Sequence, residues 1–152
     1  MYDDRGSAGE DGFSLIELMV VVLIIGILIA IALPTFLGAR TRAQDRALQT
    51  NLRTGLVAGL VFYSDNGNFT GFDVPTASGL EPSLQWVGAG GPATSDEISI
   101  QVGGGTDLLL VGMSKSGTYF CIAQVAGSPA TSRGKGAAFA GVDTLAECTG
   151  GW

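Results

Sequence analysis

Few side chains in this chain could do chemistry, because its 152 residues include no histidine. Histidine is the commonest general base and metal ligand, so Ser-His-Asp and Cys-His catalysis and His-based zinc sites are excluded. Ser132 and Lys135 have the S-x-x-K spacing of acylating serine enzymes, and the same stretch resembles a phosphate-binding loop. Both motifs are incomplete, since Pro129 replaces the loop's first glycine and no KTG element accompanies the serine. We therefore expect no enzymatic activity, no catalytic residue, no cofactor and no metal site.

Glu17 is the other conspicuous side chain, because it interrupts an apolar run. Residues 13–33 form a stretch of 21 residues in which every side chain after Glu17 is apolar or glycine. As a helix this stretch measures about 31 Å, which is enough to cross a bilayer. An unpaired carboxylate costs several kcal/mol deep in a membrane and less near its surface. The position of Glu17 therefore predicts a partner for its charge.

Three interpretations of the apolar run compete: a secretory signal peptide, a permanent anchor, and a processed segment that later enters a protein assembly. The first twelve residues carry four carboxylates and one arginine, whereas a signal peptide begins with basic residues. Ala30-Ile31-Ala32 nevertheless has the A-x-A pattern of a signal-peptide cut before Leu33. A plain anchor fits the length of the run but leaves Glu17 unexplained.

The sequence Gly12-Phe13-Ser14-Leu15-Ile16-Glu17, followed by the apolar run and Pro34, resembles the class III signal of type IV pilins and pseudopilins. The resemblance implies that a prepilin peptidase cuts between Gly12 and Phe13 and methylates Phe13. Glu17 would then be the fifth residue of the processed chain and would pair with the Phe13 amine of a neighbouring subunit. Such pairing makes a buried charge tolerable. The acidic leader, and the arginines that follow the run, depart from the usual family pattern and from the positive-inside rule.

The resemblance implies a structural subunit of a type IV pilus filament. The alternatives are a pseudopilin of a type II secretion system and a membrane-anchored or secreted binding domain. The implied partners are copies of the chain in a helical homopolymer, the prepilin peptidase, the inner-membrane pilus assembly platform and, before assembly, the membrane. With a net charge of -6 the chain has no broad basic face, so nucleic acid is a possible partner without support. The implied location is the cytoplasmic membrane for a single-pass precursor and then an extracellular filament, whose use in adhesion or motility the sequence does not distinguish.

We expect three segments: a cleaved leader over residues 1–12, a hydrophobic transmembrane and assembly helix over 13–34, and an amphipathic helix with a globular sheet over 35–152. Pro34 is expected to kink the helix where the apolar run ends. After it, leucines at a spacing of four predict a helical face that packs on a sheet. This leucine stripe consists of Leu48, Leu52, Leu56 and Leu60.

Beyond about residue 64 the sequence predicts a small antiparallel sheet. Residues 69–97 are rich in glycine, proline and hydroxyl side chains and predict an ordered surface loop. Strand-like runs follow at 98–102, 107–113 and 118–125, with short turns between them. From residue 127 onward we expect mainly loop. The fold class is therefore α+β, with a long N-terminal helix as the spine of a pilin-like ladle.

Two cysteines, Cys121 and Cys148, lie 27 positions apart. This spacing matches no metal or redox motif, and an even number of cysteines in an exported chain favours a disulfide. Two buried free thiols are the alternative if the domain is cytosolic. A disulfide here would stabilise the fold by about 3.5 kcal/mol in the chain-entropy treatment.

Overall fold

The computed structural model describes residues 12–152, so the predicted leader lies outside the described residues except for Gly12. The structure divides into two compact units between Ala39 and Arg40. The first unit contains the apolar part of helix α1 (Leu15–Asn66), and the second, residues 40–152, is called the head below. Each unit is described by itself.

Helix α1 confirms the predicted long N-terminal helix. It continues through Pro34, so the proline does not end it. It ends at Asn66, where Gly67 has a φ of 73° and donates its backbone N–H to the Tyr63 carbonyl at 2.7 Å. Glycine adopts this left-handed conformation without a steric penalty, which explains why the helix stops at the predicted turn.

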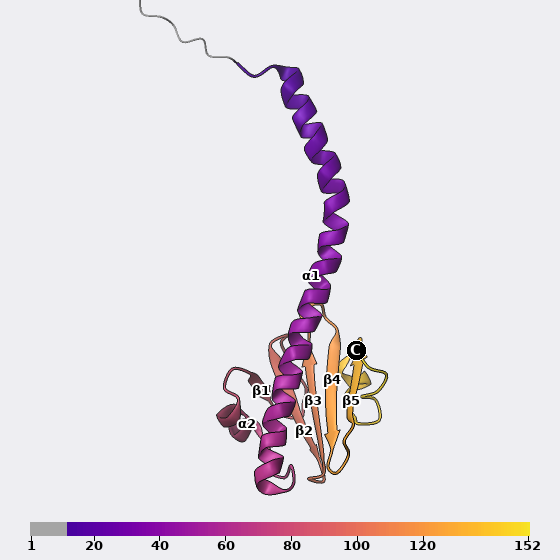
Figure 1. Cartoon of the computed structure of the whole chain (residues 1–152). Coiled ribbons are helices and arrows are strands. Elements are labelled where there is room, and N and C mark those ends of the chain that lie inside the picture. Colours follow the sequence, from indigo (N-terminus) through magenta and orange to yellow (C-terminus); the bar gives the residue numbers. More distant parts are fainter. Residues whose placement is uncertain (1–11) are drawn as a thin grey trace, which may run out of the picture. The chain divides into compact units, whose positions relative to one another are not determined.

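The head contains one sheet of five strands in the order β1-β2-β3-β4-β5 (Figure 1). Strands β2 (Glu97–Gly103), β3 (Asp107–Met113) and β4 (Tyr119–Val125) confirm the three predicted strands. Two further strands, β1 (Gln85–Val87) and β5 (Thr131–Gly136), extend the sheet at its edges. β1 pairs with β2 in parallel, and all other pairs are antiparallel. The fold is therefore α+β, as expected.

Two predicted loops were wrong in part. The segment 69–97 contains β1 and a short helix, α2 (Val74–Leu80), and the tail contains β5 and the 3₁₀ turn η1 (Phe139–Gly141). The side chain of Asp73 caps α2 by accepting the Thr76 backbone N–H at 3.0 Å. The sequence of β5, TSRGKG, has the glycine and hydroxyl content of a loop and no apolar side chain. The strand obtains its conformation from pairing with β4.

Residues 40–66 of α1, which belong to the head, lie across one face of the sheet (Figure 1). Leu48, Leu52 and Leu56 are buried there, which confirms most of the leucine stripe. Leu60 is 40% exposed and does not belong to the core, because the helix turns this position away from the sheet. The facing sheet residues alternate along the strands, as expected for one face of a pleated sheet; they are Ile98, Ile100, Leu108, Leu110, Phe120 and Ile122.

The other face of the sheet is covered by the C-terminal segment. Leu109 and Val111 of β3 pack there with Val142 and with the disulfide between Cys121 and Cys148, whose Cα atoms are 5.8 Å apart. β3 is thus covered on both faces, which explains its continuous apolar sequence.

Trp152 packs at the end of this segment against strands β4 and β5. Its indole N–H donates to the carbonyls of Cys121 and Gly134 at 3.0 and 3.1 Å, and its ring meets Phe120 edge to face. These contacts fasten the segment to β4 and β5.

Candidate processing and assembly site

The candidate cleavage site lies just before helix α1. Gly12 and Phe13 are both exposed and non-helical, and the Phe13 side chain is 83% exposed. No atom lies within 4 Å of the place where a Cβ would stand on Gly12. The bond between the two residues is therefore open to an enzyme and does not require the helix to unwind.

Glu17 lies in the first turn of α1 and has a partner within its own chain. One of its carboxylate oxygens, Oε2, accepts the backbone N–H of Ser14 at 3.1 Å. The Ser14 carbonyl in turn accepts the N–H of Leu18 at 3.2 Å, which makes Ser14 the residue that precedes the helix. A glutamate that reaches back from the third helical position satisfies an otherwise free N–H and also interacts favourably with the positive end of the helix dipole.

Sequence reasoning missed this contact, although a signal for it was present. Ser14 and Glu17 form the S-x-x-E pattern that is typical of a helix start. The contact places the carboxylate one residue away from the nitrogen of Phe13. That nitrogen would become a charged amine after a cut at Gly12, so the geometry puts an anion near the expected position of a new cation.

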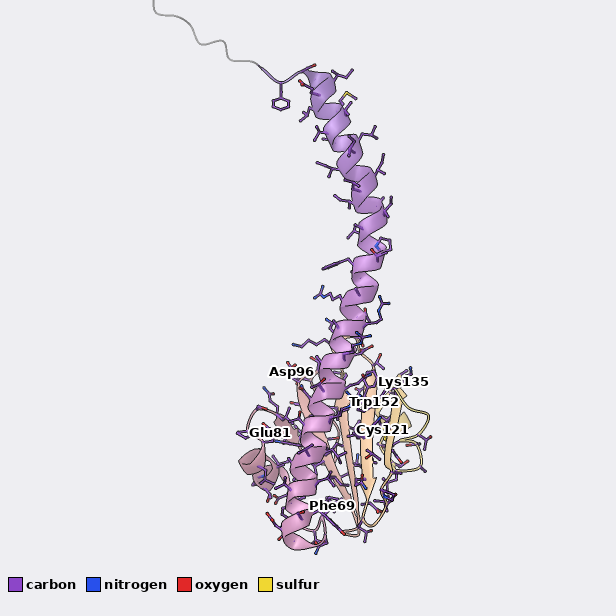
Figure 2. The ribbon with its side chains drawn as sticks, viewed as in Figure 1. Phe69, Glu81, Asp96, Cys121, Lys135 and Trp152 are labelled. Carbon is purple, nitrogen blue, oxygen red and sulfur yellow. A yellow bond between two sulfur atoms is a disulfide. The ribbon has the colours of Figure 1, made fainter. Side chains whose placement is uncertain are left out.

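The side chains behind Glu17 are uncovered. An 18-residue window of α1 has a mean hydropathy of 3.1 with none of it buried, so the helix is long and apolar enough to cross a membrane. Figure 2 shows these side chains projecting from the helix without contact to other elements. An exposed apolar surface of this size requires lipid or other protein chains around it.

Pro34 lies within this apolar helix. It has no backbone N–H to donate to the carbonyl one turn earlier. The neighbouring Thr35 hydroxyl donates to the Ala32 carbonyl at 2.9 Å, which provides this turn with a side-chain hydrogen bond. The structure thus places Pro34 in a continuous helix; its role in assembly stays a prediction.

The remaining candidate residues lie in the head and do not form a catalytic or metal site among the described residues. Ser132 and Lys135 lie in strand β5, where an S-x-x-K pair places its two side chains on opposite faces of the sheet. Among residues 12–152, no group of three or more His, Cys, Asp or Glu side chains gathers in a way that could hold a metal ion. Cys121 and Cys148 are joined by the disulfide described above.

Comparison with known families agrees with the N-terminal geometry. Residues 8–33 match the prokaryotic N-terminal methylation motif, which is the class III signal of type IV pilins and pseudopilins. No curated protein and no solved structure matches the chain. The motif supports a type IV pilin-like or pseudopilin precursor, and it suggests a structural protein rather than an enzyme. It also implies self-assembly and processing by a prepilin peptidase, and it fits a membrane-anchored precursor that later enters an extracellular filament.

Proposed function

We propose that this chain is the precursor of a structural subunit of a type IV pilus filament. A prepilin peptidase removes residues 1–12 and methylates Phe13. Residues 13–34 then hold the subunit in the cytoplasmic membrane until they enter the filament core, and residues 35–152 form its surface. The observation that carries this proposal is the methylation motif at residues 8–33 on an exposed apolar helix.

Glu17 acts in assembly by pairing with the Phe13 amine of a neighbouring subunit. The support for this role is its position at the helix start, where its carboxylate already accepts a backbone N–H. Moving the apolar helix from lipid into a protein bundle gains little hydrophobic free energy, so packing and polar pairing must favour the filament. A buried ion pair fixes the register of neighbours more effectively than it adds stability.

Two substitutions separate pairing from helix capping. Glu17→Ala removes both the charge and the hydrogen bond to Ser14, whereas Glu17→Gln removes the charge but keeps an acceptor suited to capping. If Glu17 pairs with an amine, both variants reach the membrane and are cleaved, and neither forms filaments. The measurement is the yield of sheared filaments, with cleavage followed by mass spectrometry.

Filaments from Glu17→Gln at the wild-type yield would show that capping, and not charge pairing, is the role of Glu17. Absence of filaments from the wild-type chain would contradict the proposed function itself. A pseudopilin of a type II secretion system stays the second candidate, because the matched motif is shared by pilins and pseudopilins.

A further inference from the structure

The two ends of the head carry opposite charge. At one end, Asp45 of α1 accepts hydrogen bonds from the hydroxyls of Ser114 and Ser116 in the β3–β4 turn, at 2.7 and 2.5 Å. At the other end, the Phe69 N–H donates to the Gly105 carbonyl in the β2–β3 turn at 2.8 Å. Figure 2 shows Asp96 and Phe69 at these opposite ends. We call them the basic end and the acidic end for the following reasons.

The basic end holds Arg40, Arg42 and Arg46, all exposed on α1. Within the described part of the chain none of the three arginines forms an ion pair, and the single salt bridge joins Lys115 to Asp96 at 3.3 Å. Three carboxylates lie at this end, those of Asp45, Asp96 and Glu97, against five cations: the three arginines, Lys115 in the β3–β4 turn and Lys135 of β5. Positive charge is therefore left over at this end.

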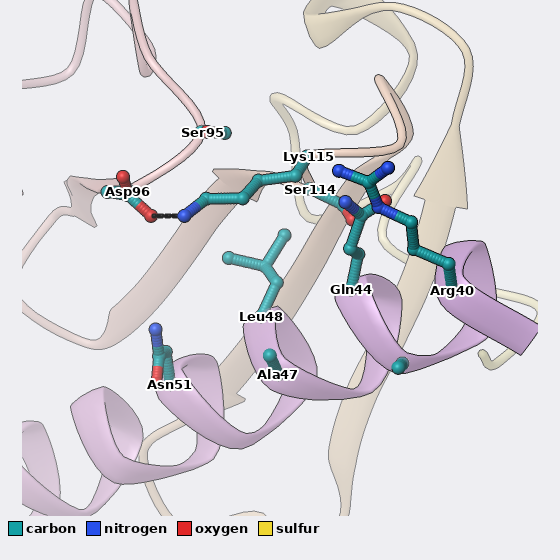
Figure 3. A pocket seen from close by; sticks show the side chains of 10 residues that line it. Arg40, Gln44, Ala47, Leu48, Asn51, Ser95, Asp96, Ser114 and Lys115 are labelled. Carbon is teal, nitrogen blue, oxygen red and sulfur yellow. Dashed lines mark ion pairs between the residues drawn. The ribbon is translucent and has the colours of Figure 1, made fainter. Parts of the chain in front are cut away.

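A recess of about 370 Å³ opens at the basic end between α1 and the β3–β4 turn. Its lining combines apolar side chains such as Leu48 with the charged groups of Arg40, Asp96 and Lys115. Figure 3 shows Lys115 extended toward Asp96, while Arg40 stands at the opposite side of the recess. Lys115 is paired with Asp96. Arg40 also lines the recess, and among the described residues no carboxylate forms an ion pair with it. The recess can therefore accept a carboxylate.

The acidic end carries Asp65 at the end of α1 and Asp107 at the start of β3. Asp107 and Asp143 line a second, smaller recess there. The stretches 62–71, 101–109 and 123–131 contain no lysine or arginine, and the last turn of α1 has no basic residue. The negative end of the helix dipole points the same way. Asp107 and Asp143 are half-buried, so Asp65 is the exposed carboxylate at this end, and no described residue bonds to its side chain.

The two ends cannot neutralise each other within one chain. Arg46 and Asp65 are 19 positions apart on the helix, which corresponds to about 29 Å, several times the distance over which salt screens surface charges. A contact between different patches on two identical chains is heterologous, and when it does not close into a ring it generates a helical filament.

We infer that the Arg40 recess at the basic end of one head binds the acidic end of a second copy, with Asp65 of that copy facing Arg40. The inference deepens the proposed function and rests on it. Opposite charges at such a contact favour one register and disfavour others, because like charges facing each other are strongly unfavourable.

The test is a charge exchange in the full-length chain, expressed in cells that assemble it. Arg40→Glu and Asp65→Arg should each lower the filament yield by about tenfold or more, because each places like charges in the contact. The chain that carries both substitutions has an acidic recess and a basic far end, so it should regain most of the wild-type yield. Two residues away from both ends of the head provide charge controls: Arg133→Glu, at an exposed position opposite Ile122 in the middle of the sheet, and Glu81→Arg, at a half-buried position after α2, should assemble normally.

Wild-type yield from both single variants would overturn the inference and leave the proposed function intact. Loss in Arg40→Glu that Asp65→Arg does not restore would also overturn it, since Arg40 would then serve another acidic partner such as a lipid phosphate. If the wild-type chain forms no filaments, the proposed function fails instead. Membrane level and the Cys121–Cys148 disulfide are checked in each variant to confirm folding.

Discussion

At the scale of single residues, Asp45 connects the helix to the sheet over a long sequence separation. Its carboxylate accepts hydrogen bonds from Ser114 and Ser116, and Ser114 is only 2% exposed. The Ser116 hydroxyl also lies 3.2 Å from the Thr118 hydroxyl, so the carboxylate holds a small polar network in the β3–β4 turn. This network holds helix α1 against the β3–β4 turn at the basic end of the head.

We predict that Asp45→Ala lowers the free energy of unfolding by about 1–3 kcal/mol, because a buried hydroxyl loses its acceptor. Thermal unfolding of the full chain in detergent, followed by circular dichroism, measures this change. Asp65→Ala is the matched control, since the exposed carboxylate at the acidic end bonds to no described residue and its loss should change stability by less than about 0.5 kcal/mol. Equal stability of both variants would contradict the role of Asp45.

Asp73 provides a pH-dependent contribution at the start of α2. Hydrogen bonds with Thr76, first through its side chain and then through its backbone, hold the pKa of the Asp73 carboxyl below its ordinary value of 3.8. An acid whose pKa is lowered by folding stabilises the fold above its unfolded pKa, and this contribution disappears as the pH falls through the lowered value.

We therefore expect the melting temperature of wild type to exceed that of Asp73→Ala at about pH 6 and the difference to shrink toward about pH 2. Melting curves of both chains across this range measure the effect. A difference that stays constant as the solution is acidified would show that Asp73 stabilises α2 without its charge.

At the scale of elements, the packing of α1 on the sheet depends on a glycine. Gly55 lies on the buried face of α1, where an added Cβ would stand 2.8 Å from the Trp86 ring and 3.2 Å from Leu110. Trp86 cannot easily move aside, because its indole N–H donates to the Glu81 carbonyl at 3.0 Å. The glycine therefore lets the helix approach the sheet closely.

Gly55→Ala separates helix propensity from packing. Propensity alone predicts that alanine stabilises a helix by about 1 kcal/mol, whereas crowding in a close-packed core costs about 1–3 kcal/mol. We expect packing to dominate and the variant to be less stable in thermal unfolding. Gly79→Ala in α2, where no atom lies within 4 Å of the added Cβ, should be neutral or stabilising. A more stable Gly55→Ala chain would contradict the close approach of helix and sheet.

The same elements show what could be predicted from the sequence. Helix α1 and strands β2 to β4 were predictable, because their apolar residues recur with the periods of helix and strand. Strand β5 and the parallel pairing of β1 were not, because these edge strands are short or weakly apolar and depend on neighbours that are distant in sequence. Leu60 shows the same limit: it continues the spacing of four, but a helix of 3.6 residues per turn gradually rotates such a stripe away from a flat surface.

At the candidate site, the apolar run and Glu17 were evident from composition, but the contact between Glu17 and Ser14 needed the conformation of the helix start. The charge difference between the two ends of the head was likewise hidden. It depends on which turns the sheet places beside the two ends of the helix segment, and hydrogen bonds between residues far apart in sequence determine this.

At the scale of the whole molecule, the two units of the chain contribute to the proposed assembly in different ways. The exposed apolar helix requires lipid or other subunits around it, and the folded head provides surface and charge. The proposed pairing of Glu17 depends on removal of the leader, because the Phe13 amine would exist only after the cut.

The most direct test is the N-terminus and intact mass of the protein isolated from its native cells. We predict a chain that starts at Phe13 and is heavier than its sequence mass by one methyl group, about 14 Da. A chain that starts at Met1 or at Leu33 would contradict prepilin processing and would indicate an anchored or secreted domain instead.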